Sequence, residues 1–62
     1  MKYPKLKAKR VEYGYTQEKL AKLLGLDHTT YSYKERGERN FTIEEVVKLM
    51  TLFNCKFEDI FL

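Results

Sequence analysis

The sequence has very little of the side-chain chemistry that enzymes and metalloproteins use. Its single cysteine, Cys55, cannot close an internal disulfide, and one histidine with one cysteine cannot supply the ligand set of a zinc site. A chain of 62 residues has room for a small core but not for a large substrate cavity. We therefore expect no enzymatic activity, no metal and no cofactor, and we interpret Cys55 as a small hydrophobic residue.

Long apolar runs are missing as well. No stretch approaches the roughly 18 to 20 apolar residues that span a bilayer. The basic N-terminus, MKYPKLKAKR, is not followed by the apolar segment of a secretory signal. These absences predict a cytoplasmic protein in which residues 1–62 form one domain.

Positive charge is concentrated in the first two thirds of the chain. The formal net charge is +3, but residues 1–40 hold ten basic and five acidic side chains, and the remaining residues are net acidic. Such a distribution suits a polyanionic partner, because phosphates dominate the affinity of nucleic-acid complexes. Taken alone, it is equally typical of a solvated basic surface.

Turn and capping residues divide the sequence into five short helices and indicate an all-α fold. Pro4 fits a first helical turn, Thr16 and Asp27 are good N-caps, and Thr42 with Glu45 forms a capping box. Glycines 14, 25 and 37 and Asn54 are typical of helix ends. The predicted helices are Pro4 up to Gly14, Gln17 to Leu24, His28 to Arg36, Ile43 up to Asn54, and Phe57 to Phe61.

Helical spacing also predicts which side chains face the core. In the first helix one face carries Tyr3, Leu6, Arg10 and Tyr13. The last helix is expected to return Phe57, Ile60 and Phe61 to the core. The fourth helix is expected to present an inner stripe of Ile43, Val46, Val47, Met50 and Phe53.

The third helix is short of core residues, since Tyr31 is its main apolar side chain. It follows the second helix after only three residues, 25–27, and two short helices so joined form a helix-turn-helix unit. In that unit the second helix enters the major groove and reads base edges. The exposed polar face of helix 28–36 therefore predicts base contacts, against the alternative of a merely solvated face, by His28, Thr29, Ser32 and Tyr33.

The chain resembles the Cro/cI-type, or Xre-type, helix-turn-helix family over about residues 5–62. The resemblance is carried by YTQEKLA at 15–21, GLD at 25–27, YS at 31–32, ERG at 35–37 and FEDIF at 57–61. It implies a compact five-helix, lambda-repressor-like domain. It also implies a sequence-specific transcriptional regulator of bacterial or phage type, a repressor or Cro-like protein that binds double-stranded operator DNA as a homodimer.

The resemblance assigns residues to roles. The base-contacting positions of the family fall on His28, Thr29, Ser32 and Tyr33. Gln17 matches a residue that contacts phosphate and braces the recognition helix, and the other phosphate-contacting positions are Thr16, Arg36, Arg39 and Asn40. Arg10 lies in an apolar stripe where a bare charge is expensive, and the family pairs such an arginine with the residue that is Glu35 here.

Two positions depart from the family pattern. Lys34 stands where relatives carry a large apolar residue, so we expect it to snorkel or turn outward, with an effect on the tilt of the third helix. Lys56 stands where a Ser or Thr cap is common, so we expect fraying of the last turn.

Excess apolar residues near the C-terminus predict a dimer surface formed by Leu52, Phe57, Phe61 and Leu62. The DNA-binding function has two alternatives. The first is a protein-interaction module such as the antitoxin of a toxin–antitoxin pair, which predicts a stable complex with another protein. The second is an enzyme, for which the sequence offers no catalytic constellation.

Overall fold

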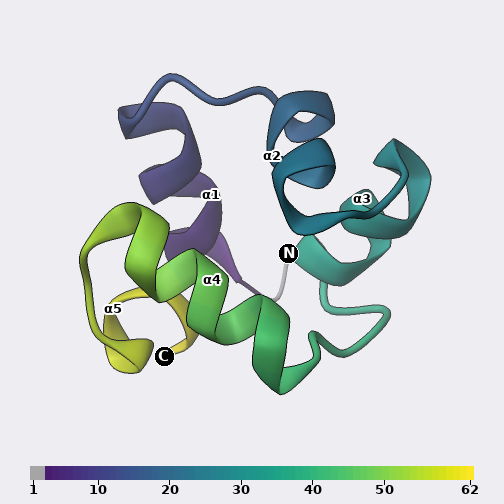
Figure 1. The fold of residues 1–62 in the computed structure, drawn as a ribbon. Coiled ribbons are helices and arrows are strands. Elements are labelled where there is room, and N and C mark those ends of the chain that lie inside the picture. The colour runs from purple at the N-terminus through teal and green to yellow at the C-terminus, as the bar shows by residue number, and fades with distance from the viewer. Residues whose placement is uncertain (1–2) are drawn as a thin grey trace.

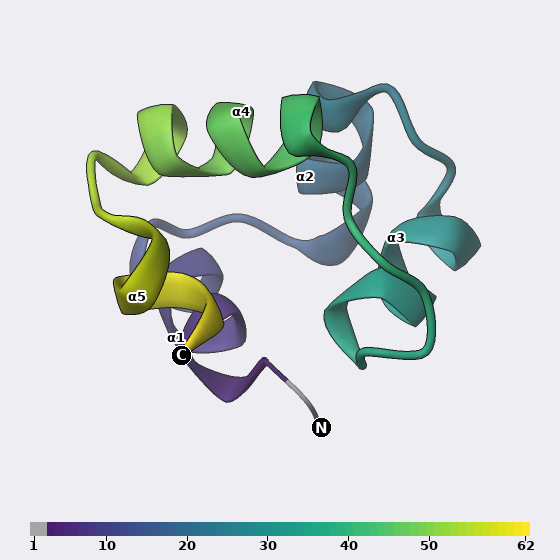
Figure 2. The same cartoon turned by 90° about the horizontal axis from the view of Figure 1, so that it is seen from below.

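Helices account for nearly all regular structure in the computed structural model, which describes residues 3–62. Figure 1 shows α2 packed against α3 in one half of the molecule and α1 beside α5 in the other, and α4 lies across both halves in both views (Figures 1 and 2). The all-α, five-helix prediction is confirmed. The helices are α1 (Pro4–Glu12), α2 (Gln17–Leu24), α3 (His28–Glu35), α4 (Ile43–Phe53) and α5 (Phe57–Phe61).

Local hydrogen bonds explain why the helices begin where they do. The side chains of Thr16 and Asp27 accept from backbone N–H groups three residues later, and Thr42 forms the full capping box with Glu45. Lys56 makes no side-chain cap bond at the start of α5, as its residue type predicts. Asp59 Oδ2 accepts from the Lys56 backbone N–H at 3.0 Å, which supplies the other half of a capping box.

Helix ends were nearly as predictable as helix starts. Gly25 ends α2 with a φ of 76° and Asn54 ends α4 with a φ of 48°, both in the left-handed region. The third helix is one residue shorter than predicted. It ends at Glu35, and Arg36 is the capping residue with φ and ψ still in the right-handed helical region.

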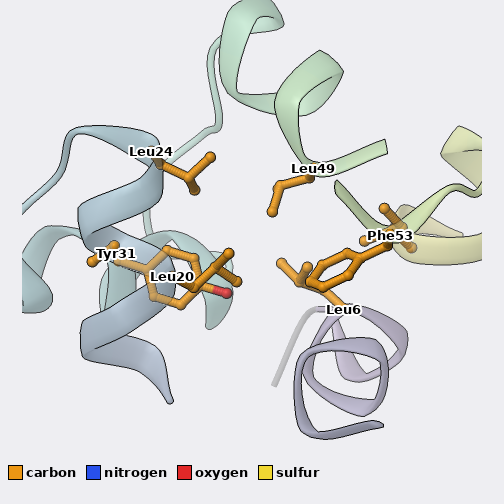
Figure 3. Close-up of a cluster of buried hydrophobic side chains, with 8 residues drawn as sticks. Leu6, Leu20, Leu24, Tyr31, Leu49 and Phe53 are labelled. Carbon is orange, nitrogen blue, oxygen red and sulfur yellow. The ribbon is translucent and has the colours of Figure 1, made fainter. Parts of the chain in front are cut away.

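The core draws one or more side chains from each of the five helices. Figure 3 shows those of α2 and α3 on one side, facing Leu6 and Phe53 on the other, with Leu49 of α4 between them. Cys55 packs half-buried against this cluster, as expected of a small hydrophobic residue. The buried apolar residues are Leu6, Leu20, Ala21, Leu24, Tyr31, Leu49, Phe53 and Ile60.

The predicted inner stripe of α4 is partly wrong. Ile43 is 83% exposed and Val47 is 49% exposed, whereas Leu49, which was not predicted, is fully buried. The inward face instead follows residues 45, 49 and 53, which lie four apart on the helix. Glu45 occupies an inward position because its charge is compensated there, and this rotates the two β-branched residues outward.

Two aromatic residues lie at the edge of the core; Tyr13 was expected in the core or at its boundary, whereas Phe57 was expected to return to the core. Tyr13 is 46% exposed, and its hydroxyl donates to the Phe53 carbonyl at 3.0 Å, so its ring covers Phe53 from outside. Phe57 is 47% exposed and stacks against Phe61 at a centroid distance of 5.0 Å. Both rings cover the core rather than fill it.

Lys34 supplies the positive charge that compensates Glu45 on the inward face of α4. Its side chain neither snorkels nor turns outward: it is buried, and Nζ lies 2.6 Å from Glu45 Oε1. The same oxygen accepts from the Thr42 backbone N–H at 3.0 Å. Burial alone raises the pKa of Glu45, but the hydrogen bonds from Lys34 and Thr42 outweigh it and lower that pKa. A buried ion pair thus fixes α3 to the start of α4.

Replacing Glu45 removes the ion pair and half of the capping box together. We expect Glu45→Ala to lower the free energy of unfolding by about 3 to 5 kcal/mol, because the Lys34 ammonium stays buried without its partner. The matched control is Glu44→Ala, one residue earlier and exposed, with an expected loss below about 1 kcal/mol. Urea unfolding followed by circular dichroism measures both. Equal losses for the two variants would show that the pair contributes nothing.

Candidate nucleic-acid interface

The connection between α2 and α3 determines how the two helices cross. Gly25 takes a left-handed conformation, Leu26 is half-buried against the core, and Asp27 accepts from the Thr30 N–H and hydroxyl at 3.1 and 2.6 Å. The left-handed residue reverses the chain and the cap starts the next helix immediately. Residues 17–35 thus form a helix-turn-helix unit, as the sequence predicted.

A buried carboxylate holds this unit against α1. Glu35 has no solvent exposure, and its Oε2 accepts from Arg10 Nε at 2.9 Å and from the Tyr31 hydroxyl at 2.6 Å. Its Oε1 accepts from Gln17 Nε2 at 3.0 Å. Arg10 donates further from Nη1 to the Tyr15 carbonyl at 2.9 Å. The ion pair between Arg10 and Glu35 is therefore present, and the Glu35 carboxylate meets side chains of α1, α2 and α3.

The contacts of Glu35 also determine charge states. Burial alone raises the pKa of Glu35, but the hydrogen bonds from Tyr31, Gln17 and Arg10 hold it below its usual value of 4.5. Burial and the adjacent carboxylate raise the pKa of Tyr31, so its hydroxyl stays protonated and donates. Sequence reasoning missed this tyrosine as a partner, although its spacing of four residues from Glu35 on one helix is a usable signal.

The outer face of α3 is polar and open to solvent. His28 and Thr29 are exposed, Ser32 and Tyr33 are half-buried, and these four line one shallow hollow together with Arg36. The structure therefore brings the four predicted base-contacting residues onto one face. Hydroxyl groups and an imidazole ring on that face can both donate and accept hydrogen bonds.

Two arginines lie against the ring of Tyr33. The Arg36 Cζ is 5.0 Å and the Arg39 Cζ 5.7 Å from its centroid, which are cation–π distances. Arg36 Nε also lies 3.0 Å from Glu38 Oε2 in an exposed ion pair. Tyr33 thus positions two cations at the C-terminal end of α3, an arrangement that the sequence did not predict.

The remaining phosphate-contacting candidates do not all gather in one place. Thr16 and Gln17 lie at the start of α2, where Gln17 Oε1 is 3.2 Å from His28 Nε2. Gln17 therefore contacts α3 at two residues, consistent with a bracing role. Asn40 is exposed but lines a different hollow, beside Tyr3 and Phe41. It is thus separated from the hollow at the outer face of α3.

The apolar candidates for a dimer surface are divided as well. Leu62 is 75% exposed and Phe57 is nearly half exposed, whereas Leu52 and Phe61 are half-buried against the core. A second apolar hollow lies between α2 and α4, where Leu23 is 49% exposed, and Leu52 lines this hollow. The predicted dimer residues are therefore divided between two hollows, because Phe57, Phe61 and Leu62 line another one.

Residues 3–62 contain neither a membrane-spanning helix nor a cluster of metal ligands. None of the described helices is long and apolar enough to cross a membrane. Within the same residues no three His, Cys, Asp or Glu side chains gather in a way that could hold a metal ion.

The depressed pKa values of Glu35 and Glu45 predict a loss of stability in acid. Each folded-state pKa lies below the unfolded value of 4.5, so the stabilisation is fully present above pH 4.5 and is lost as the pH falls through the folded value. Thermal unfolding at pH 7, 4.5 and 3 should show a falling midpoint. Glu35→Gln should be less stable than the wild type at pH 7 and should lose less on acidification. A wild-type midpoint that stays constant down to pH 3 would contradict this account.

Comparison with known proteins places the chain in a family. A family model described as helix-turn-helix matches residues 6–60. An uncharacterised HTH-type transcriptional regulator of Archaeoglobus fulgidus is 38% identical over 53 residues, which cover 86% of this chain and 76% of the relative. The uncharacterised HTH-type transcriptional regulator YgzD of Bacillus subtilis is 33% identical, over 92% of this chain and 86% of its own. The relatives thus include archaeal as well as bacterial proteins.

Solved structures agree with the sequence comparison. The restriction-modification controller protein C.AhdI from Aeromonas hydrophila superposes with a TM-score of 0.72 at 34% identity, covering 89% of this chain and 80% of that protein. The hypothetical transcription factor NHTF from Neisseria gives a TM-score of 0.75 at 29% identity, over 94% of this chain and 67% of that protein. The family consists of non-enzymatic transcriptional regulators, which agrees with the expectation from the sequence that the chain is not an enzyme. The chain therefore belongs to the Cro/cI-type, Xre-like helix-turn-helix family of transcriptional regulators.

Proposed function

We propose that this protein is a sequence-specific repressor or Cro-like regulator that places α3 in the major groove of operator DNA. The main support is the polar outer face of α3, held in place from behind by the Glu35 hydrogen bonds. The major groove is about 12 Å wide and admits one helix. The names of the relatives, HTH-type transcriptional regulators, support the same function.

Within this proposal, base edges are read by His28, Thr29, Ser32 and Tyr33. They line one hollow on the outer side of α3, where His28 and Thr29 are exposed and Ser32 and Tyr33 are half-buried. Thr29 and Ser32 carry hydroxyls that adapt to donors or acceptors, and the His28 ring adds directional hydrogen bonds. Tyr33 is held by its two arginines, so it contributes the edge of its ring and its hydroxyl.

Phosphate contacts flank this face on both sides. At the start of α2, Thr16 uses its oxygen to accept from the Lys19 N–H, which leaves its hydroxyl hydrogen for a phosphate. The free amides beside Gln17 attract the same group. Beyond the C-terminal end of α3, the cations Arg36 and Arg39 are exposed. Asn40 follows Arg39 directly in the chain and is the fifth predicted phosphate contact, although it lines the hollow of Phe57, Phe61 and Leu62.

We further propose that the protein binds DNA as a homodimer through the end of the molecule that carries Phe57, Phe61 and Leu62. Leu52, the fourth predicted residue of the dimer surface, lines the hollow between α2 and α4 instead. Phe57 and Leu62 are the exposed apolar side chains of α5 and its end, and they line one hollow with Phe61. A two-fold dimer places its two recognition helices one DNA turn, or about 34 Å, apart.

Substitutions on α3 separate base reading from phosphate binding. His28→Ala or Ser32→Ala should relax the preference at one base pair by about 1 to 3 kcal/mol, whereas Arg36→Ala should weaken all sequences alike and flatten the dependence on salt. The measurement is selection from a random DNA pool at two salt concentrations. The DNA-binding proposal fails if the wild type enriches no motif and binds without salt dependence. A motif unchanged after replacing both His28 and Ser32 would show that α3 presents another face.

The dimer surface can be tested with two equally exposed apolar residues. Phe57→Asp should convert the dimer to a monomer. A carboxylate buried in an apolar interface loses its hydration without gaining a partner, which costs about several kcal/mol. Leu23→Asp is the matched control, on the separate apolar surface between α2 and α4, and should leave the dimer intact. Analytical ultracentrifugation with and without operator DNA measures the mass. A dimer lost in the control but kept in Phe57→Asp would move the interface to α2 and α4.

A further inference from the structure

The hydrogen bonds that run from Glu35 through Gln17 to His28 have a fixed direction. Glu35 accepts from Arg10 and Tyr31 at one oxygen and from Gln17 at the other. An ionised carboxylate can only accept, so the NH₂ group of Gln17 must face Glu35. The amide oxygen of Gln17 then faces His28, at 3.2 Å from Nε2.

This direction determines the hydrogen positions on the His28 ring. An amide oxygen can only accept, so Nε2 of His28 must carry a hydrogen. A neutral imidazole has one ring hydrogen, which leaves Nδ1 as a bare acceptor. Within residues 3–62, the contact with Gln17 is the one hydrogen bond of this ring. Nδ1 is therefore the nitrogen left for a ligand at the exposed face of α3.

We propose that His28 presents Nδ1 to the major groove as an acceptor and thereby selects a base that offers an amino group. The inference rests on the proposed function, since it specifies what one base-reading residue recognises. Amino donors in the major groove belong to cytosine and adenine, whereas guanine offers only acceptors there. Adenine offers both a donor and an acceptor, so the informative comparison is cytosine against guanine.

The charged groups around the ring come from three helices. Lys7 and Arg10 of α1, Glu18 of α2 and Glu35 of α3 share one hollow with His28, and Arg36 shares the hollow on its other side. Arg10 is neutralised by Glu35, and Glu18 pairs with Lys22. Asp27, next to the ring in sequence, directs both carboxylate oxygens at Thr30. None of these groups supplies a hydrogen-bond acceptor to Nδ1.

The tautomer can be measured on the free protein, independently of DNA. Long-range proton–nitrogen correlation spectra of the histidine ring at pH 8.5 should show the hydrogen on Nε2 and a bare Nδ1. Gln17→Ala should convert this into a mixture of both tautomers, because the acceptor that selects Nε2–H is gone. A wild-type ring with its hydrogen on Nδ1 would overturn the inference whatever the protein binds.

The base preference is measured by selection from random DNA at pH 8.5, with the wild type and with His28→Gln. At the one base pair that depends on residue 28, the wild type should prefer cytosine over guanine by about 5- to 150-fold. His28→Gln should prefer adenine, because its amide pairs with both adenine groups.

The failures of the two proposals are distinguishable. A guanine preference of the wild type at pH 8.5, or a motif with no position that responds to His28→Gln, overturns the inference while leaving DNA binding in place. Absence of any enriched motif and of salt-dependent binding overturns the proposed function and the inference with it.

Discussion

The fold of this small protein depends on one buried carboxylate. Glu35 is fully excluded from solvent, a position in which an isolated charge is very costly. It is tolerated because Arg10 supplies the opposite charge and Tyr31 and Gln17 supply neutral donors, each from a different helix. Since these partners have to meet at one point, the relative positions of the first three helices are determined by hydrogen-bond geometry as well as by apolar contact.

This arrangement compensates for what α2 and α3 lack individually. Helices of eight residues are scarcely stable alone, and α3 contributes only one large apolar side chain to the core. Tyr31 fills that role with its ring and joins the Glu35 hydrogen bonds with its hydroxyl. The inner side of α3 therefore makes the contacts with the core and with α1, and its outer side carries polar residues that the core does not require. A sequence on this scaffold can change what it recognises without changing how it folds.

Features that depend on neighbouring residues were predictable, and those that depend on distant ones were less so. Helix starts at Gln17, His28 and Ile43 followed from caps that act over three residues. The ion pair of Arg10 with Glu35 was reachable because a charge in an apolar stripe needs a partner, and the family resemblance supplied it. The inward face of α4 could not be predicted in this way, because it depends on the contact between Lys34 of α3 and Glu45 of α4. A charge at each position, taken alone, indicates an exposed residue.

The site shows the same division. A polar outer face on α3 follows from periodicity, so the grouping of His28 with Thr29 and Ser32 could be expected from the sequence. The stacking of two arginines on Tyr33 could not, because Arg39 lies beyond the end of the helix in a loop whose path no local pattern determines. The assignment of these residues to bases and phosphates stays a prediction.

The shared oxygen of Glu45 bears on how such a sequence can change over evolutionary time. That oxygen serves an ion pair and a helix cap together, so losing the acid first leaves both Lys34 and the Thr42 N–H without it. Losing the lysine first leaves the buried acid without its counter-charge but keeps the helix cap, so this loss removes one interaction rather than two. Substitution at this pair therefore has a preferred order, with position 34 becoming apolar before position 45 is released. Relatives that carry a large apolar residue at position 34 and still keep an acid at position 45 would represent the intermediate step.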